Sequence, residues 1–229
     1  LPLYAVWRSL LGGASLREIA DRYHTSPQAV QGAVLRLGRQ AMAAEMCLRA
    51  ALRPRERVVF DGLRSFVVSK DYPCDITTVV EPDGETILTM EHTVFTRGGT
   101  TTAAQGRRLA RRLARWRPEP GTMSRDISRV VGELWDYLRP GLCDPAVIDT
   151  DEHPLYRPAI RGSTPARHYR PAGLLWHLRT PGSAPRTTEN RLFAVNYIDR
   201  LLRHRLREQR HQRRPSLPKI CRSPRSPWR

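Results

Sequence analysis

The chain has 229 residues, enough for one sizeable hydrophobic core or for a small domain followed by a larger one. It carries 39 basic and 22 acidic side chains, a formal net charge of +17, and its only lysines are Lys70 and Lys219. Arginine makes bidentate contacts with phosphate and guanine that lysine cannot make. This balance therefore supports nucleic acid as the partner.

The four cysteines are widely separated and include no C-x-x-C pair. This spacing argues against a zinc site and against a small disulfide framework, so we expect a protein of the reducing cytoplasm. No stretch reaches the roughly 18 apolar residues of a membrane span, and the N-terminus lacks the pattern of a signal peptide. We therefore expect no membrane partner.

Residues 1–54 are predicted to form a helix-turn-helix DNA-binding domain. Apolar residues recur at helical spacing over residues 4–11 and 16–23, and Ser26-Pro27 predicts a third helix that runs to about residue 42. In a helix-turn-helix the helix after the short turn enters the major groove. The side chains expected to face DNA are Gln28, Gln31, Arg36 and Arg39. A plain three-helix bundle with solvated glutamines is the alternative.

Residues 56–70, ERVVFDGLRSFVVSK, are interpreted as the first catalytic strand of a nuclease-like sheet. Residues 58–60 favour a buried strand, Asp61-Gly62 is a typical turn signal, and extended chain resumes at residues 65–68. An acid at the end of a buried strand is held rigidly and half shielded from water, as a ligand of a divalent metal must be. The alternative is that Asp61 only starts a hairpin.

Two more strands, at residues 75–80 and 86–95, flank a turn at residues 81–84, which predicts three consecutive antiparallel strands. The later predicted elements are helices at 105–116 and 123–138, a short strand from 146, a helix at 154–161, a strand at 166–169 or 174–178, and a helix at 195–209. The first of these helices carries a run of arginines that is either a solvated face or a contact for a DNA backbone: Arg107, Arg108, Arg111, Arg112, Arg115 and Arg117.

Carboxylates follow the strand from residue 146, at Asp149, Asp151 and Glu152. An acidic helix cap explains one of these acids but not three. Asp61 and Asp151 each end an apolar strand, and Asp199 lies on the last helix. Three carboxylates are the minimum set that holds two divalent cations for phosphodiester chemistry. Aspartate oxygens suit a hard cation, Mg²⁺ or Mn²⁺.

Three short blocks around these acids resemble, in order, those of the DDE transposases of bacterial insertion sequences: DGLRSFV at residues 61–67 with Lys70, TDEHP at 150–154 with Tyr156, and IDR at 198–200 with Leu202 and Leu206. The resemblance covers roughly residues 10–210. It implies an α+β (α/β) fold in which the helix-turn-helix precedes a ribonuclease H-like catalytic domain, residues 55–209, with a mixed sheet flanked by helices. It further implies Mg²⁺-dependent cleavage and joining of double-stranded DNA at insertion-sequence ends by a homo-oligomer. Asp61 and Asp151 would then be the first and second metal ligands.

The third ligand position departs from this family, which most often has glutamate there. The matching residue is Asp199, and Glu189, in a polar loop, is the fallback. Helical periodicity stops near Gln209, where such transposases usually continue, and residues 210–229 are predicted to be a basic disordered tail. We therefore hypothesise a truncated or frameshifted copy that is degenerate and inactive.

Two other functions stay open. A non-enzymatic helix-turn-helix DNA-binding regulator would use the acids structurally and would need no metal. A nuclease or resolvase of the same fold, without strand transfer, would share every residue named above.

Overall fold

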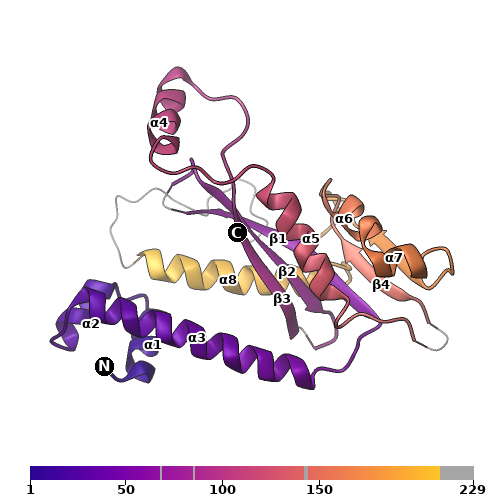
Figure 1. Cartoon of the computed structure of the whole chain (residues 1–229), viewed down its shortest axis with the longest axis horizontal. Helices are drawn as coiled ribbons and strands as arrows, with labels where there is room; N and C mark the ends of the chain where they lie inside the picture. The colour runs from indigo at the N-terminus through magenta and orange to yellow at the C-terminus, as the bar shows by residue number, and fades with distance from the viewer. Residues whose placement is uncertain (68, 85, 142–143, 212–229) are drawn as a thin grey trace. The chain divides into compact units, whose positions relative to one another are not determined.

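The computed structural model describes residues 1–211 except 68, 85, 142 and 143, with residues 49, 50 and 204–211 described by backbone alone (Figure 1). The tail predicted to be disordered covers residues 210–229; residues 210 and 211 instead end a helix, and residues 212–229 lie outside the described residues. The described residues divide into two compact units, one with Leu1–Leu52 and residues 199–211, the other with Arg53–Ile198. Among the described helices, none combines the length and apolar character that a membrane crossing requires.

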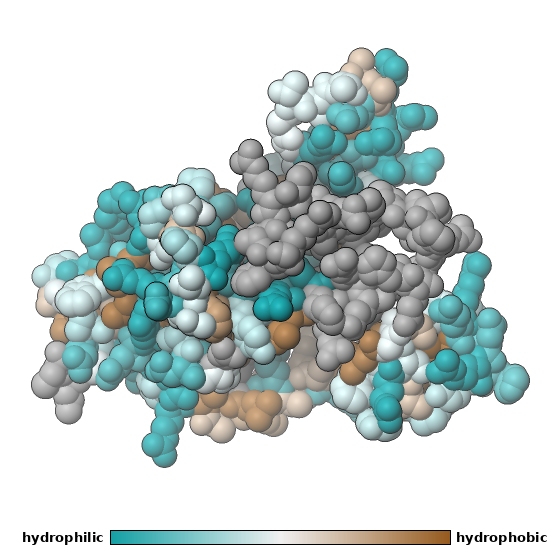
Figure 2. All heavy atoms as spheres, turned by 180° about the vertical axis from the view of Figure 1, so that it is seen from behind, coloured by the Kyte–Doolittle hydropathy of each residue, from teal (hydrophilic) through white to brown (hydrophobic). Residues whose placement is uncertain are grey.

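The elements in chain order are α1 (Leu3–Leu11), α2 (Leu16–Arg22), α3 (Pro27–Ala51), β1 (Arg57–Phe66), β2 (Pro73–Glu81), β3 (Thr86–Val94), α4 (Ala103–Leu113), α5 (Thr122–Leu134), β4 (Ala146–Thr150), α6 (Tyr156–Gly162), α7 (Thr164–Tyr169), β5 (Leu175–Arg179) and α8 (Phe193–His211). Hydrophilic side chains make up most of the coloured surface in Figure 2, in line with the high net charge.

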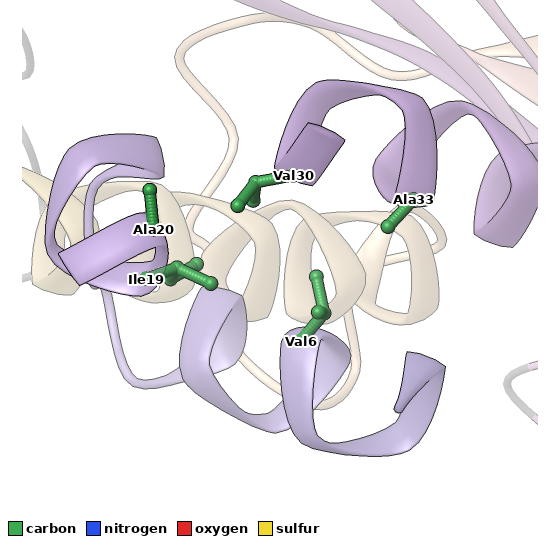
Figure 3. Packing of buried hydrophobic residues seen from close by; sticks show 5 residues of the cluster. All are labelled: Val6, Ile19, Ala20, Val30 and Ala33. Carbon is green, nitrogen blue, oxygen red and sulfur yellow. The ribbon is translucent and has the colours of Figure 1, made fainter. Parts of the chain in front are cut away.

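The three N-terminal helices pack around a small core of their own. Its buried side chains point toward one another in Figure 3: Val6, Ile19, Ala20, Val30 and Ala33. Ser15 begins α2 with a capping box, in which its hydroxyl accepts from the Glu18 N–H at 3.2 Å. Between α2 and α3 the chain turns through His24, whose φ of 48° is left-handed.

Helix α3 begins where Ser26-Pro27 predicts it, and the Ser26 hydroxyl accepts from the Ala29 N–H at 3.1 Å. The predicted end near residue 42 is wrong, since the helix runs on to Ala51. Residues 41–51 are mostly strong helix formers, and the first proline after them is Pro54. The helix therefore continues although the side chains of residues 41–48 are all exposed.

The segment after the N-terminal helices folds as an α+β unit around a five-stranded mixed sheet of order β3-β2-β1-β4-β5. Strands β1, β2 and β3 pair antiparallel, as predicted, whereas β4 pairs parallel with both β1 and β5. This order and these directions are consistent with a ribonuclease H-like topology. Of the two predicted positions for the last strand, 174–178 is confirmed and 166–169 is wrong, because the latter forms α7 behind Pro165.

Helices α5 and α6 cover one face of this sheet (Figure 1). Helix α5 packs on β3 through its apolar side, and Thr93 donates a hydrogen bond to Asp126 at 2.8 Å. The Tyr156 ring at the start of α6 stacks on Phe60 of β1 with 4.3 Å between ring centroids. The apolar stripe predicted within 123–138 is thus confirmed, although the helix itself ends at Leu134.

The predicted turn at Asp61-Gly62 is wrong, since β1 runs unbroken through both residues. Gly62 serves a different purpose here. A Cβ added to it would lie 2.5 Å from a carboxylate oxygen of Asp75 and 2.9 Å from the Tyr156 hydroxyl. The absent side chain makes room for these two groups, so the D-G pair marks a close approach within the sheet.

The arginine-rich helix α4 is joined to the loop between β1 and β2 by a buried acid, Asp71. Its carboxylate lies 3.0 Å from Arg108, 3.4 Å from Arg112 and 3.7 Å from Arg97. Burial alone would raise the pKa of Asp71, but the hydrogen bond and charge of Arg108, with the other two guanidinium charges, lower it. Two of the six arginines of the predicted run therefore have a structural role.

We predict that Gly62→Ala lowers the free energy of unfolding by about 1–3 kcal/mol, because its methyl group would collide with side chains that are themselves buried and bonded. Urea denaturation measures this change. The matched control is Gly132→Ala within α5, where nothing lies within 4 Å of the added Cβ. There a gain of about 0.5–1 kcal/mol is expected. Equal effects at the two positions would contradict the packing account.

Candidate metal centre

Asp61 lies in the middle of β1 and is 8% exposed. One of its carboxylate oxygens accepts from the N–H of Gly62 at 2.7 Å. Burial, followed by the negative charge of Asp151, raises the pKa of Asp61 from 3.8 to about 7, although the Gly62 hydrogen bond and the charge of Arg186 oppose the rise. The strand thus holds an acid that is only about half ionised at neutral pH, and a bound cation would favour its ionised form.

Asp151 follows directly on the last residue of β4. The parallel register pairs Phe60 with Thr150, so that the next residue on each strand is one of the two predicted acids. One Asp151 oxygen accepts from the N–H of His153 at 2.7 Å, which fixes the carboxylate at the strand end. The sheet therefore brings Asp61 and Asp151 close to each other, even though Asp61 does not end its strand.

A third carboxylate, Asp75, lies beside this pair and was not expected from the sequence. Its charge also raises the pKa of Asp61. Both of its oxygens are occupied, one by the Arg64 guanidinium at 3.0 Å and the other by the Thr77 hydroxyl at 2.9 Å. Asp75 therefore adds a further negative charge next to Asp61, and only the β1–β2 register could have revealed it.

The positive charge at the pair comes from the loop before α8. Arg186 hydrogen-bonds through its guanidinium to the side-chain oxygen of the buried Asn196, and its charge lowers the pKa of Asp61. No predicted element includes Arg186, and nothing in the sequence around it indicated a role near the acids.

The other acids after β4 have different surroundings. Asp149 is fully buried and pairs with Arg57 of β1 at 2.8 Å, which ties the two parallel strands together. Burial raises the pKa of Asp149, and Arg57 opposes this effect. Glu152 is exposed, as is the fallback Glu189 in the loop before α8. The three carboxylates of the sequence pattern thus divide into a structural acid, a candidate ligand and a surface group.

Asp199 is buried on α8, in the other compact unit, and stays a prediction as the third ligand. Across the described residues, no group of three His, Cys, Asp or Glu side chains is arranged to hold a metal ion. Gln28, Gln31, Arg36 and Arg39 are all exposed on α3, and their predicted contact with DNA stays a prediction.

The Asp61–Asp151 pair fits a hard divalent cation. Two carboxylates held close together in a site with little water repel each other, and a doubly charged ion bound between them offsets that repulsion. Both are oxygen donors, the type that Mg²⁺ and Mn²⁺ prefer. Asp61 and Asp151 are thus the residues of this sheet that could hold such an ion.

We predict that the metal-free protein loses stability as the pH rises from about 4 to about 7, the window between the ordinary and the raised pKa of Asp61. The folded protein keeps a proton there that the unfolded chain releases. Asp61→Asn removes this loss, so at pH 8 in EDTA the variant is expected to be more stable than wild type, by up to about 4 kcal/mol.

Urea unfolding at pH 5 and pH 8 measures both proteins. Asp83→Asn, in the exposed turn between β2 and β3, provides the control and is expected to leave the pH dependence unchanged. An Asp61→Asn protein that is less stable than wild type at pH 8 in EDTA would contradict the pKa shift.

Comparison with known proteins gives no relative for this chain: no protein-family model and no curated protein sequence matches it.

Proposed function

We propose that this chain is a DDE-type transposase, which cleaves and transfers DNA strands at the ends of an insertion sequence with the help of Mg²⁺ or Mn²⁺. The observation that carries the proposal is the pair Asp61 and Asp151, set side by side on adjacent parallel strands near the centre of the sheet. The strand order supports the finer assignment of a ribonuclease H-like catalytic domain.

In this proposal Asp61 and Asp151 hold the metal, and Asp199 completes the set. A divalent cation bound there supplies a means to activate a water or hydroxyl and to stabilise the departing oxygen of a phosphodiester. The chain's own residues prepare the site. The sheet fixes both carboxylates, and Arg186 offsets part of their negative charge in the absence of metal.

The N-terminal helices support the DNA-binding half of the proposal. Helices α2 and α3 are separated by a short turn, have their own core and expose Gln28 and Gln31 at the start of α3. Glutamine pairs bidentately with adenine in the major groove, and Arg36 and Arg39 follow on the same helix. Binding at both ends of an element implies a homo-oligomer on DNA.

The first test combines metal binding with strand cleavage. Calorimetric titration with Mn²⁺ is expected to give a heat signal that Asp61→Asn and Asp151→Asn abolish. Nicking of a supercoiled plasmid that carries the DNA flanking the gene is expected to fall by roughly 100-fold or more in the same variants. Asp83→Asn, an equal change of charge at an exposed turn, is expected to preserve both signals.

A decayed copy gives a distinct outcome, namely Mn²⁺ heat that depends on both aspartates without any nicking.

The second candidate function is a DNA-binding regulator, which the separate core of the N-terminal helices favours. For a regulator, duplex binding is expected to depend on Gln28 and Gln31, while Mn²⁺ gives no heat in any variant.

A further inference from the structure

A pocket of about 400 Å³ lies at the β5 edge of the sheet and is lined by arginines from three successive segments. Arg157 and Arg161 come from α6, Arg170 follows α7, and Arg179 ends β5. The floor includes His177 and the buried Leu175. The predicted elements did not indicate this convergence, because the four arginines are spread over 23 sequence positions (157–179) that include a predicted helix and a predicted strand.

The positive charge of this pocket is not balanced by acids. None of the lining residues is acidic, and within the described part of the chain none of the four arginines forms an ion pair. Burial and the charges of the other three arginines lower the pKa of Arg161, which shows that they lie close enough to repel one another. Repulsion among these four positive charges lowers the stability of the fold, so a bound anion would stabilise it.

His177 does not add to this charge at neutral pH. Burial, and then the four arginines, lower its pKa to about 4. The Thr150 hydroxyl donates its single proton to the Asp151 carbonyl at 2.7 Å, so it accepts from Nε2 of His177 at 2.9 Å. The pocket floor is therefore fixed to the end of β4, the residue before a candidate metal ligand.

We propose that this pocket binds the phosphate groups of a DNA strand. The planar guanidinium group matches phosphate oxygens with two parallel hydrogen bonds, and four such groups on an exposed sheet edge can engage more than one phosphate of a polymer. The choice of DNA as the polymer rests on the proposed function, whereas the anion site itself does not. A strand held here lies over His177, whose ring is hydrogen-bonded to Thr150, the residue before Asp151.

The test uses the full chain and a fluorescein-labelled single-stranded oligonucleotide. A single strand has no major groove, so the helix-turn-helix cannot recognise it in the way it would recognise a duplex. Anisotropy is measured in EDTA, so that metal binding plays no part. Arg161→Gln combined with Arg179→Gln is expected to weaken binding at least tenfold. The dependence of log affinity on log salt is expected to become shallower by roughly 1.4, about 0.7 for each single-strand phosphate that the variant no longer neutralises.

Arg125→Gln is the matched control, because Arg125 lies on α5 in the same unit and pairs with the exposed Glu119 at 3.1 Å. It is expected to bind within twofold of wild type. Because the double variant removes mutual repulsion, its melting temperature at low salt is expected to be no lower than that of wild type. NMR titration of His177, assigned with His177→Gln, is expected to show its pKa rise when the oligonucleotide is bound.

Unchanged oligonucleotide affinity in the double variant overturns the proposal. Inorganic pyrophosphate that competes as strongly as the oligonucleotide, at equal phosphate concentration, also overturns it in favour of a small-anion site. A loss of strand binding in the double variant without any Mn²⁺ heat in wild type would leave the pocket in place and reject the transposase.

Discussion

The sheet unit places two carboxylates side by side where little water reaches them, and the rest of its structure has to accommodate their repulsion. Asp61 and Asp151 are brought together by the parallel pairing of β1 with β4. Folding gives up hydration of Asp61 and adds repulsion from Asp151, and the protein compensates in part with Arg186 and the Gly62 N–H. Buried acidic pairs that lower stability in this way are usually functional, because a neutral residue would fill a purely structural role with less loss of stability.

Much of the scaffold could be predicted from the sequence because local patterns determine it. The helix starts at Ser15 and Ser26-Pro27, the antiparallel strands after residue 56 and the apolar side of α5 each follow from periodicity and capping. Errors arose where a tertiary neighbour overrode a local signal. Asp61-Gly62 is a turn signal in isolation, yet pairing with β2 carries β1 through both residues, and the glycine leaves room for Asp75 and Tyr156.

The candidate site shows the same division. Asp61 and Asp151 could be identified because each stands at or near an apolar run, which is visible in one dimension. Asp75, Arg186 and the arginine pocket could not, since each acquires its meaning only from residues on other elements. The acidic pair and the basic pocket are joined through a single hydroxyl, Thr150, so opposite charges meet at the end of one short strand.

The Arg57–Asp149 ion pair joins residues 92 positions apart, so β1 is synthesised long before the strand that it pairs with through this contact. The β1–β2–β3 meander is complete before β4 leaves the ribosome, so one side of β1 waits with its backbone hydrogen-bonding groups unpaired. Phe60, fully buried in the finished fold, lacks its stacking partner Tyr156 during that interval. A chain that stops before residue 146 therefore exposes the unpaired edge of β1 to other chains, and we expect it to aggregate.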